Sequence, residues 1–262
     1  MSRERSDIAG VLLAGGSGKR MRPLTAHTNK HLIPVHMRPM IEYPLGTLLG
    51  MGLREILVIT GRGHMGSVVD VLGSGQAYGD GVDLTYKVQD EAGGIAHALA
   101  LAEPFVGGRK VAVVLGDNVF DDDGLVPAFD AFAAGDASHA LNVLAEVGNP
   151  ESYGVATLDE GRIAEIVEKP TQPASRLAVT GLYLYPADVF GKVAALEPSA
   201  RGELEITDVN NLYATEGRLH AYETKNWFDA GEPEPWMRTQ AYVADHPERF
   251  PPSRFRLREK RA

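Results

Sequence analysis

Residues 8–25 read IAGVLLAGGSGKRMRPLT, an apolar run that leads directly into a glycine-rich turn and a basic pair. The apolar run 8–14 predicts a buried strand, and Gly15–Gly18 permits a tight turn because glycine adopts positive φ angles and allows close approach to the backbone. Backbone N–H groups in such a turn can bind a phosphate, and Lys19 and Arg20 add positive charge. The stretch therefore predicts a strand followed by a phosphate-binding turn.

Two well-known glycine loops do not fit this turn. A Walker A loop requires Ser or Thr after Gly-Lys and a glycine five residues before it, whereas this chain has Arg20 and Leu13 at those positions. A dinucleotide-binding loop requires a third glycine where Met21 stands. An ordinary strand-to-helix connection also remains compatible with the turn, so the turn alone leaves the reaction open.

Length, composition and charge restrict the class of protein. The chain has 262 residues, of which 44% are hydrophobic and 23% charged, which is enough for one large α/β domain with a full core. It has no cysteine, which excludes disulfides, thiolate metal sites and cysteine nucleophiles. The formal net charge of −9 argues against a nucleic-acid partner. No apolar run is long enough for a membrane span and the start MSRERSD lacks a signal core, so we expect a cytoplasmic protein.

Apolar, β-rich runs alternate with helix-like segments along the chain. In the first half the predicted strands are 8–14, 55–61, 82–88 and 110–115, and the predicted helices are 40–51, 64–72, 94–103 and 124–133. In the second half the predicted strands are 140–146, 154–158, 163–168, 178–185 and 219–223, with helices at 187–195, 205–216 and 232–245. This alternation predicts an α/β fold with a mostly parallel sheet and helices on both faces, and Asp159-Glu160-Gly161 predicts a hairpin turn.

Candidate ligand-binding groups follow three of the predicted strands. The glycine turn follows the first strand, Gln89 follows the strand that ends at residue 88, and Asp117 follows the strand that ends at residue 115. Ligands collect at the carboxyl ends of parallel strands, so we expect these groups to converge on one crevice. Asp117 is a candidate Mg²⁺ ligand, because Mg²⁺ binds through one or two carboxylates plus substrate phosphates; a capping aspartate is the alternative.

Three further charged positions are candidates, each with a structural alternative. Lys30 precedes an apolar stretch, the pair Glu168-Lys169 ends a strand-like run, and Asp229 lies between aromatic residues and a glycine. Exposed lysines and surface ion pairs are common, whereas a buried Asp229 would need a partner. The histidines at 27, 31 and 36 span a proline, so we interpret them as surface or packing residues rather than metal ligands. A serine hydrolase is also disfavoured, because the chain has no G-x-S-x-G elbow around Ser17.

Several motifs together resemble one family, the sugar-1-phosphate nucleotidylyltransferases, with the closest similarity to glucose-1-phosphate thymidylyltransferases. The motifs are LLAGGSGKRMRPLT, NKHLIPV, RPMIEYPL, LGDNVF, EKP, AVTGLYLY, GELEITDVNNLY and WFDAGEP, which span residues 8 to about 231. The resemblance implies a three-layer α/β/α sandwich with a mixed, mainly parallel, Rossmann-like sheet. It implies a single domain over 1–262, with a nucleotide-binding part at 8–135, a sugar-phosphate-binding part at 136–231 and a variable helix and tail at 232–262.

The resemblance also implies a reaction and a set of site residues. A sugar 1-phosphate would attack the α-phosphorus of a nucleoside triphosphate, dTTP or UTP, and release pyrophosphate with help from Mg²⁺; the family also implies a homo-oligomer. The catalytic residues would be Arg20 at the β/γ-phosphates, Lys30 near the α-phosphate and Lys169 at the sugar phosphate. Asp117 and Asp229 would hold the metal. The other nucleotide-binding positions would be Leu13, Gly15, Gly16, Ser17, Gly18, Gln89 and Gly94, and the sugar phosphate would also meet Tyr153, Gly154, Glu168 and Val179.

Three departures from the family pattern leave alternatives open. Gly93 replaces an acidic residue and His97 a glutamine in the loop after Gln89, so UTP or another nucleotide, or a different sugar phosphate, remains an alternative. Glu232 replaces the usual threonine after Ala-Gly. The helical extension that carries a second nucleotide site in longer members is not expected here. A non-catalytic binding homologue is disfavoured because all the charged candidates are present, and an oxidoreductase because the dinucleotide motif is broken.

Overall fold

The computed structural model describes residues 5–16, 18–135 and 138–251. The chain divides into two compact units. The first contains Met1–Ala92, Val114–Asp121 and Phe228–Ala262, and the second contains Gly93–Val113 and Asp122–Trp227. The single domain expected from the sequence stays a prediction.

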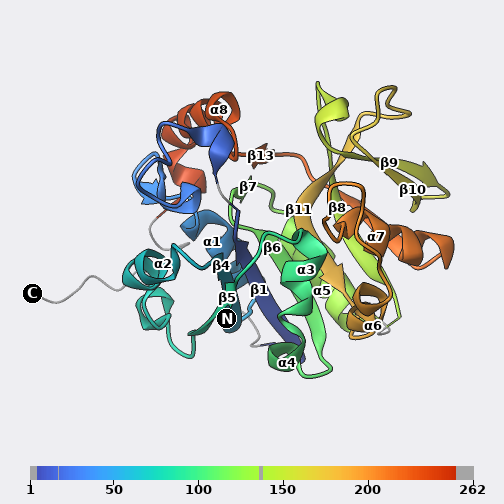
Figure 1. Ribbon diagram of the computed structural model, residues 1–262, viewed down its shortest axis with the longest axis horizontal. Coiled ribbons are helices and arrows are strands. Elements are labelled where there is room, and N and C mark those ends of the chain that lie inside the picture. Colours follow the sequence, from blue (N-terminus) through green and yellow to red (C-terminus); the bar gives the residue numbers. More distant parts are fainter. Residues whose placement is uncertain (1–4, 17, 136–137, 252–262) are drawn as a thin grey trace, which may run out of the picture. The chain divides into compact units, whose positions relative to one another are not determined.

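Three parallel strands form the sheet of the first unit, in the order β5 (Asp83–Gln89), β4 (Glu55–Gly61), β1 (Ile8–Ala14). All seven residues of β1 are buried, as expected for an interior strand of a parallel sheet. Helices α1 (Glu42–Gly50) and α2 (Met65–Leu72) connect these strands (Figure 1). Because the three strands are parallel, the segments that follow their last residues, Ala14, Gly61 and Gln89, lie along one edge of the sheet.

Two short ladders and helix α8 (Pro233–Asp245) complete the first unit. One ladder pairs β2 (Pro34–Val35) with β3 (Arg38–Pro39), and the other pairs β7 (Asn118–Phe120) with β13 (Trp227–Asp229). Figure 1 shows α8, in red, beside the blue segment that contains β2. A buried apolar cluster joins these pieces; it consists of Val35, Met40, Tyr43, Val119, Ala230, Val243 and Phe250. The cluster fixes the chain on both sides of Asp229.

The second unit contains a mixed sheet in the order β6-β11-β8-β12-β10-β9. The strands are β6 (Lys110–Leu115, whose last two residues belong to the first unit), β8 (Ala140–Glu146), β9 (Gly154–Asp159), β10 (Arg162–Glu168), β11 (Leu177–Tyr185) and β12 (Leu219–Glu223). The helices are α3 (Ile95–Ala100), α4 (Glu103–Val106), α5 (Leu125–Ala134), α6 (Val189–Ala194) and α7 (Ile206–Thr215). Strands β9 and β10 pair across the predicted hairpin turn, where Glu160 and Gly161 have φ of 47° and 78°.

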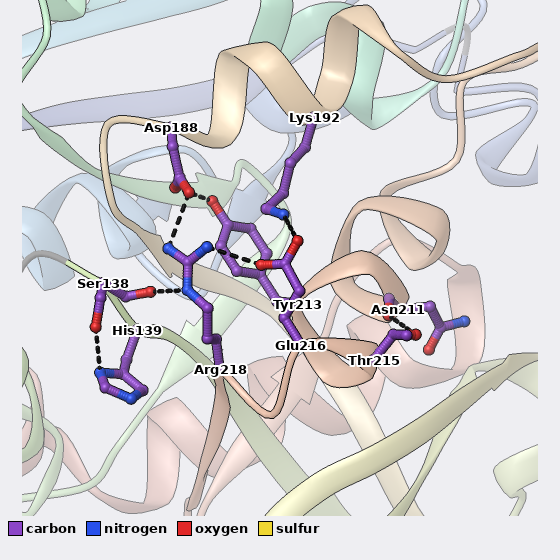
Figure 2. A network of polar contacts seen from close by, with 9 residues as sticks. All are labelled: Ser138, His139, Asp188, Lys192, Asn211, Tyr213, Thr215, Glu216 and Arg218. Carbon is purple, nitrogen blue, oxygen red and sulfur yellow. Dashed lines mark hydrogen bonds and ion pairs between the residues drawn. The ribbon is translucent and has the colours of Figure 1, made fainter.

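A polar network centred on Arg218 joins α6 and α7 in the second unit (Figure 2). The Arg218 guanidinium donates to Asp188 at 2.8 Å and to Glu216 at 2.7 Å, and it lies over the ring of Tyr213. Lys192 lies over the same ring and donates to Glu216 at 2.5 Å. Each charged group in the network therefore has a partner of opposite charge, and these ion pairs connect α6 and α7 to the residue that precedes β12.

The observed elements confirm the predicted α/β class with a mixed sheet and flanking helices. The predicted helix 94–103 is wrong in one respect, because α3 ends at Ala100 and a separate α4 begins at Glu103. Pro104 explains the break, since proline has no N–H to continue the helical hydrogen bonds. Among the residues that the structure describes, no helix has the length and apolar character needed to cross a bilayer.

Candidate functional site

The glycine turn has the backbone that the sequence predicted. Gly16 and Gly18 have φ of 101° and 58°, values that residues with side chains rarely adopt. A side-chain carbon built on Gly15 would lie 2.9 Å from Gln89 Oε1, so the end of β5 lies directly beside the turn. Ser17 lies outside the described residues. The structure thus brings Gln89 to the turn, and phosphate binding by the turn remains a prediction.

Asp117 reaches the same edge of the sheet through Gly116. The Gly116 N–H donates to the Leu13 carbonyl at 2.8 Å, which ties the end of β6 to the end of β1. A side-chain carbon on Gly116 would lie 2.7 Å from His31 Cδ2 and 3.0 Å from the Leu13 carbonyl oxygen. Only glycine therefore fits between them, and the close approach places Asp117 beside the glycine turn.

Lys30 forms a buried ion pair with Asp117. The Lys30 ammonium donates to Asp117 Oδ2 at 2.5 Å, and only 15% and 11% of the two side chains are exposed. Burial alone would raise the pKa of Asp117, but the charge of Lys30 and hydrogen bonds from Lys30 and Asn118 hold that pKa well below its ordinary value. Burial likewise opposes the charge on Lys30, but Asp117 raises its pKa overall. Both groups are therefore ionised at neutral pH.

Asp229 comes to Asp117 from the far end of the chain. Pairing of β7 with β13 and a hydrogen bond from the Ala230 N–H to the Asp117 carbonyl at 2.8 Å fix the two segments together. A side-chain carbon on Gly231 would lie 2.7 Å from Asp117 Oδ2 and 2.9 Å from Asp229 Oδ1. The two carboxylates therefore flank one small space. Burial and the negative charge of Asp117 raise the pKa of Asp229 to about 6.

These two carboxylates could bind a divalent cation whose remaining ligands come from a bound substrate or from water. Their mutual repulsion is the kind that a cation relieves, and hard cations prefer carboxylate oxygens. Within residues 5–16, 18–135 and 138–251, no cluster of three or more His, Asp or Glu side chains forms a closed metal site. A cation here would therefore take its remaining ligands from water or from the phosphates of a substrate, as Mg²⁺ commonly does.

Arg20 lies in the short 3₁₀ turn Lys19–Met21 that follows the glycine turn. Its guanidinium pairs with Glu232, the residue that precedes α8. Both side chains are accessible, with 71% and 46% of their surface exposed. The sequence identified Arg20 as a phosphate-binding candidate and identified Glu232 as unusual, but it gave no sign that the two residues meet.

His31 is a supporting residue whose position the sequence did not distinguish from those of its neighbours. His27 and His36 are exposed, whereas His31 is buried with Nδ1 2.7 Å from Asn29 Oδ1. Asn29 also donates from its side chain to the Ala14 carbonyl at 3.3 Å. Burial and the nearby Lys30 charge lower the pKa of His31 to about 3. The neutral ring thus lies between Asn29 and Gly116 and fills the space beside Gly116.

This buried histidine predicts a specific loss of stability in acid. The pKa of His31 is near 6.5 in the unfolded chain and about 3 in the folded one, so its contribution to stability is present above pH 6.5 and is lost as the pH falls toward 3. Urea unfolding from pH 7.5 to 4.5 should show wild type losing up to about 1.4 kcal/mol per pH unit more than His31→Gln. Equal slopes for the two proteins would contradict a buried neutral His31.

The second unit gathers the residues expected around a sugar phosphate. Gly154 faces Glu168 across the β9–β10 ladder, and the Lys169 N–H donates to the Tyr153 carbonyl at 2.9 Å. Val179 belongs to β11, which pairs with β9 at the neighbouring residue 178. Lys169 has a φ of 44°, a strained value for a residue with a side chain. Such strain persists only where the surrounding structure imposes it, and it is concentrated at functional sites.

Glu168 forms a hydrogen bond and ion pairs with residues that include two, Thr207 and Arg201, not predicted from the sequence. Thr207 donates to Glu168 Oε2 at 2.9 Å, and the Arg201 guanidinium lies 3.6 Å from Glu168 Oε1. Lys169 Nζ lies 3.9 Å from the same oxygen. Arg201 also pairs with Glu205 at 2.9 Å. Arg201 directly precedes the motif GELEITDVNNLY. A positive charge beside that motif was the only signal in the sequence that could have indicated a role for Arg201.

Gly94 has a structural role that explains why it is glycine. Its φ is 94°, and a side-chain carbon there would lie 2.4 Å from the Leu204 carbonyl oxygen. The Leu204 N–H donates to the Gly93 carbonyl at 2.8 Å. Gly94 thus joins the start of α3 to the loop before α7, and its expected contact with a base stays a prediction.

Comparisons with known proteins show the family and the fold of this chain. A model of the family described as nucleotidyl transferase matches residues 9–246. A glucose-1-phosphate thymidylyltransferase of Actinoplanes sp. is 42% identical over 240 residues, covering 90% of this chain and 78% of the relative. A crystal structure assigned to a glucose-1-phosphate thymidylyltransferase of Bacillus anthracis, with bound sucrose, is 47% identical with a TM-score of 0.85, covering 91% of this chain and 96% of that one.

A more distant structure shows the same fold. A UDP-glucose pyrophosphorylase in complex with UDP-glucose has a TM-score of 0.80 at 24% identity, covering 90% of this chain and 98% of that one. Its likeness confirms the predicted fold type.

Proposed function

This chain belongs to the nucleotidyl transferase family, and from that premise we propose that it couples dTTP to α-D-glucose 1-phosphate, forming dTDP-glucose and pyrophosphate. The observation that carries the proposal is the meeting of Asp117, Asp229 and Lys30 beside the glycine turn. That arrangement places the ammonium group of Lys30 and two carboxylates beside the glycine turn. Relatives named as thymidylyltransferases support the choice of substrates.

The first unit would bind and polarise the triphosphate. The glycine turn would hold it through backbone N–H groups, Arg20 would bind the β- and γ-phosphates, and Lys30 would neutralise the α-phosphate. Asp117 and Asp229 would hold Mg²⁺, which supplies charge neutralisation to the bound phosphates. The attacking sugar phosphate is already ionised at neutral pH, so the reaction needs positioning and charge neutralisation rather than a general base.

Gln89 would select a pyrimidine base. Its amide can both donate to and accept from a pyrimidine edge, and its side chain lies next to Gly15 in the structure. It does not distinguish thymine from uracil, because that choice depends on one methyl group worth about 1–3 kcal/mol. UTP is therefore the alternative donor, and a different sugar 1-phosphate is the alternative acceptor.

Lys169 and Arg201 of the second unit would bind the sugar phosphate. Both cations lie within 4 Å of Glu168, and Arg201 also pairs with Glu205. About half of each cationic side chain is exposed, so each is accessible to an anion. The strained backbone of Lys169 fixes the direction in which its side chain leaves the strand. The expected contact of Tyr153, Gly154 and Val179 with the sugar belongs to the same proposal.

Arg201→Ala is expected to raise the KM for glucose 1-phosphate about tenfold or more. A hydrogen bond to a charged group is worth about 1.5–3 kcal/mol, and 1.4 kcal/mol corresponds to tenfold. The KM for dTTP should change much less, because Arg201 belongs to the second unit. Arg176→Ala, which removes another exposed arginine of that unit, is the matched control. Equal increases in both KM values would contradict a role at the sugar phosphate.

A pyrophosphate-release screen tests the proposed function. It would cross dTTP, UTP, CTP, ATP and GTP with several sugar 1-phosphates, each with and without Mg²⁺. The expected result is the fastest release with dTTP and glucose 1-phosphate and none without the metal. Release from no pair would overturn the proposal, and fastest release with UTP would correct the donor. The expected cytoplasmic location and homo-oligomer also remain predictions, and light scattering tests the second.

A further inference from the structure

The contact between Arg20 and Glu232 uses a residue to which the proposed reaction gives no role. Glu232 lies three residues after Asp229 and directly precedes α8, yet its carboxylate turns away from the helix to Arg20. Arg20 in turn lies two residues after the glycine turn. The carboxylate therefore occupies the one guanidinium that the proposed function assigns to the β- and γ-phosphates.

The sequence of α8 explains why Glu232 is available for this contact. A carboxylate before a helix normally accepts hydrogen bonds from the free N–H groups of the first turn. Here Pro233 and Pro235 remove two of those donors, and the Glu232 side chain makes no capping hydrogen bond. The backbone carbonyl of Glu232 still accepts from the Trp236 N–H at 2.9 Å, so the helix begins normally. The side chain is thus free of the helix, and its position is held by the backbone.

Packing around α8 keeps Glu232 close to Arg20. The Trp236 indole N–H donates to the Pro34 carbonyl at 2.9 Å, and Val243 belongs to the buried cluster with Val35 and Ala230. These contacts fix the first turn of α8 on the unit that carries Arg20. The ion pair is therefore a product of the fold, since 212 residues separate its members along the chain.

We propose that Glu232 is an internal competitor of the triphosphate: it neutralises Arg20 in the free enzyme, and the β- and γ-phosphates of the incoming nucleotide displace it. This inference rests on the proposed function of Arg20. Once the phosphates displace it from Arg20, the Glu232 carboxylate is an unpaired negative charge in the site while the nucleotide is bound. Glu232 therefore weakens the binding of both the triphosphate and the pyrophosphate product, and it sets the nucleotide concentration at which the enzyme works.

The expected effect is moderate because the pair is exposed. Exposed ion pairs contribute at most about 1 kcal/mol, which corresponds to roughly fivefold in affinity. Glu232→Gln should therefore lower the KM for dTTP about two- to fivefold. The change should fall on KM rather than on kcat, because Glu232 opposes binding and does not contact the reacting phosphorus. The inhibition constant for pyrophosphate should fall by a similar factor.

The experiment compares wild type, Glu232→Gln, Arg20→Ala and the double variant. Steady-state kinetics give KM and kcat for dTTP, and titration calorimetry with inorganic tripolyphosphate and Mg²⁺ gives affinity without turnover. The matched control is Glu234→Gln, which removes a neighbouring carboxylate of α8 that pairs with Arg238 instead. In the Arg20→Ala background, Glu232→Gln should lose most of its effect on affinity.

The outcomes separate this inference from the proposed function. Tighter tripolyphosphate binding by Glu232→Gln, abolished by Arg20→Ala, supports the competition even if the substrate pair were misassigned. A higher Mg²⁺ requirement in Glu232→Gln would overturn the competition and make Glu232 a metal-binding residue. Equal binding by wild type, Glu232→Gln and Glu234→Gln would also overturn it. Absence of pyrophosphate release from every substrate pair in wild type refutes the proposed function separately.

Discussion

Asp229→Asn is expected to slow pyrophosphate release about 10²–10³-fold and, in the same protein, to raise thermal stability in the absence of metal. The loss of rate follows from removing one of the two carboxylates that would hold Mg²⁺ at the phosphates, a charge-stabilising contact of the reaction. The gain in stability follows from the position of Asp229 beside Asp117. Replacing it by a neutral side chain removes the repulsion between two adjacent like charges.

The pH dependence of the stability change tests its cause. The pKa of Asp229 is about 6 in the folded protein, above its ordinary value of 3.8. Protonated Asp229 therefore stabilises the fold below pH 3.8, and this stability is lost as the pH rises through 6. The melting temperature in EDTA should be higher for Asp229→Asn than for wild type at pH 8, and the difference should shrink at pH 4.5.

Two results would contradict this account of Asp229. A variant with near-normal turnover would remove Asp229 from the metal site. A variant with lower stability than wild type at pH 8 in EDTA would show that the carboxylate is structurally required rather than repelled by Asp117. Wild type with saturating Mg²⁺ at pH 8 is the internal control, because bound metal should recover the stability that ionised Asp229 removes.

Asp117→Asn is expected to lower the rate by at least about 10²–10³-fold and to lower stability as well. It removes the partner of the buried Lys30 ammonium, and an uncompensated buried charge costs about 3–5 kcal/mol. The charge of Asp229 also acts on Lys30, so we expect the lower end of this range. Urea unfolding in EDTA measures the loss, and pyrophosphate release measures the rate.

A second variant separates the two effects of Asp117→Asn. Combining it with Lys30→Met removes the uncompensated charge, so stability should recover substantially while the rate stays low. Recovery of the rate in the double variant would show that Asp117 and Lys30 form only a structural pair. The opposite changes in stability for Asp117→Asn and Asp229→Asn follow from one geometry, in which Lys30 binds directly to one of two adjacent carboxylates.

Much of the fold was predictable because the long elements have clear local signals. The strands at 8–14, 55–61, 110–115, 140–146 and 219–223 lie at the predicted residues, since each is an apolar or alternating run bounded by turn residues. Strands β2, β3, β7 and β13 have only two or three residues each and carry no measurable period. They form because their partners are held nearby by the buried cluster around Tyr43 and Ala230.

The candidate site divides in the same way. The glycine turn, Gln89 and Asp117 were expected at strand ends from the residues alone. Arg20, Lys30, Glu168-Lys169 and Asp229 were charged candidates to which the resemblance gave roles, and the resemblance supplied the other sugar-phosphate residues. Arg201 and the buried His31 were not assigned roles. The local sequence around Arg201 or His31 does not show whether the residue belongs to a site, to the surface or to the core. That depends on which residues lie next to it in space.

The sequence by itself determined the order of the long strands and helices, the need for glycine after the first strand, and the family. Only the tertiary structure decided that Lys30 pairs with Asp117, that the Asp229 carboxylate lies beside that of Asp117, and that Glu232 forms an ion pair with Arg20. The physical reason is range. Backbone propensity and hydrophobic period act over a few residues, whereas burial and charge act through space, between side chains that the chain separates by 87 to 212 positions.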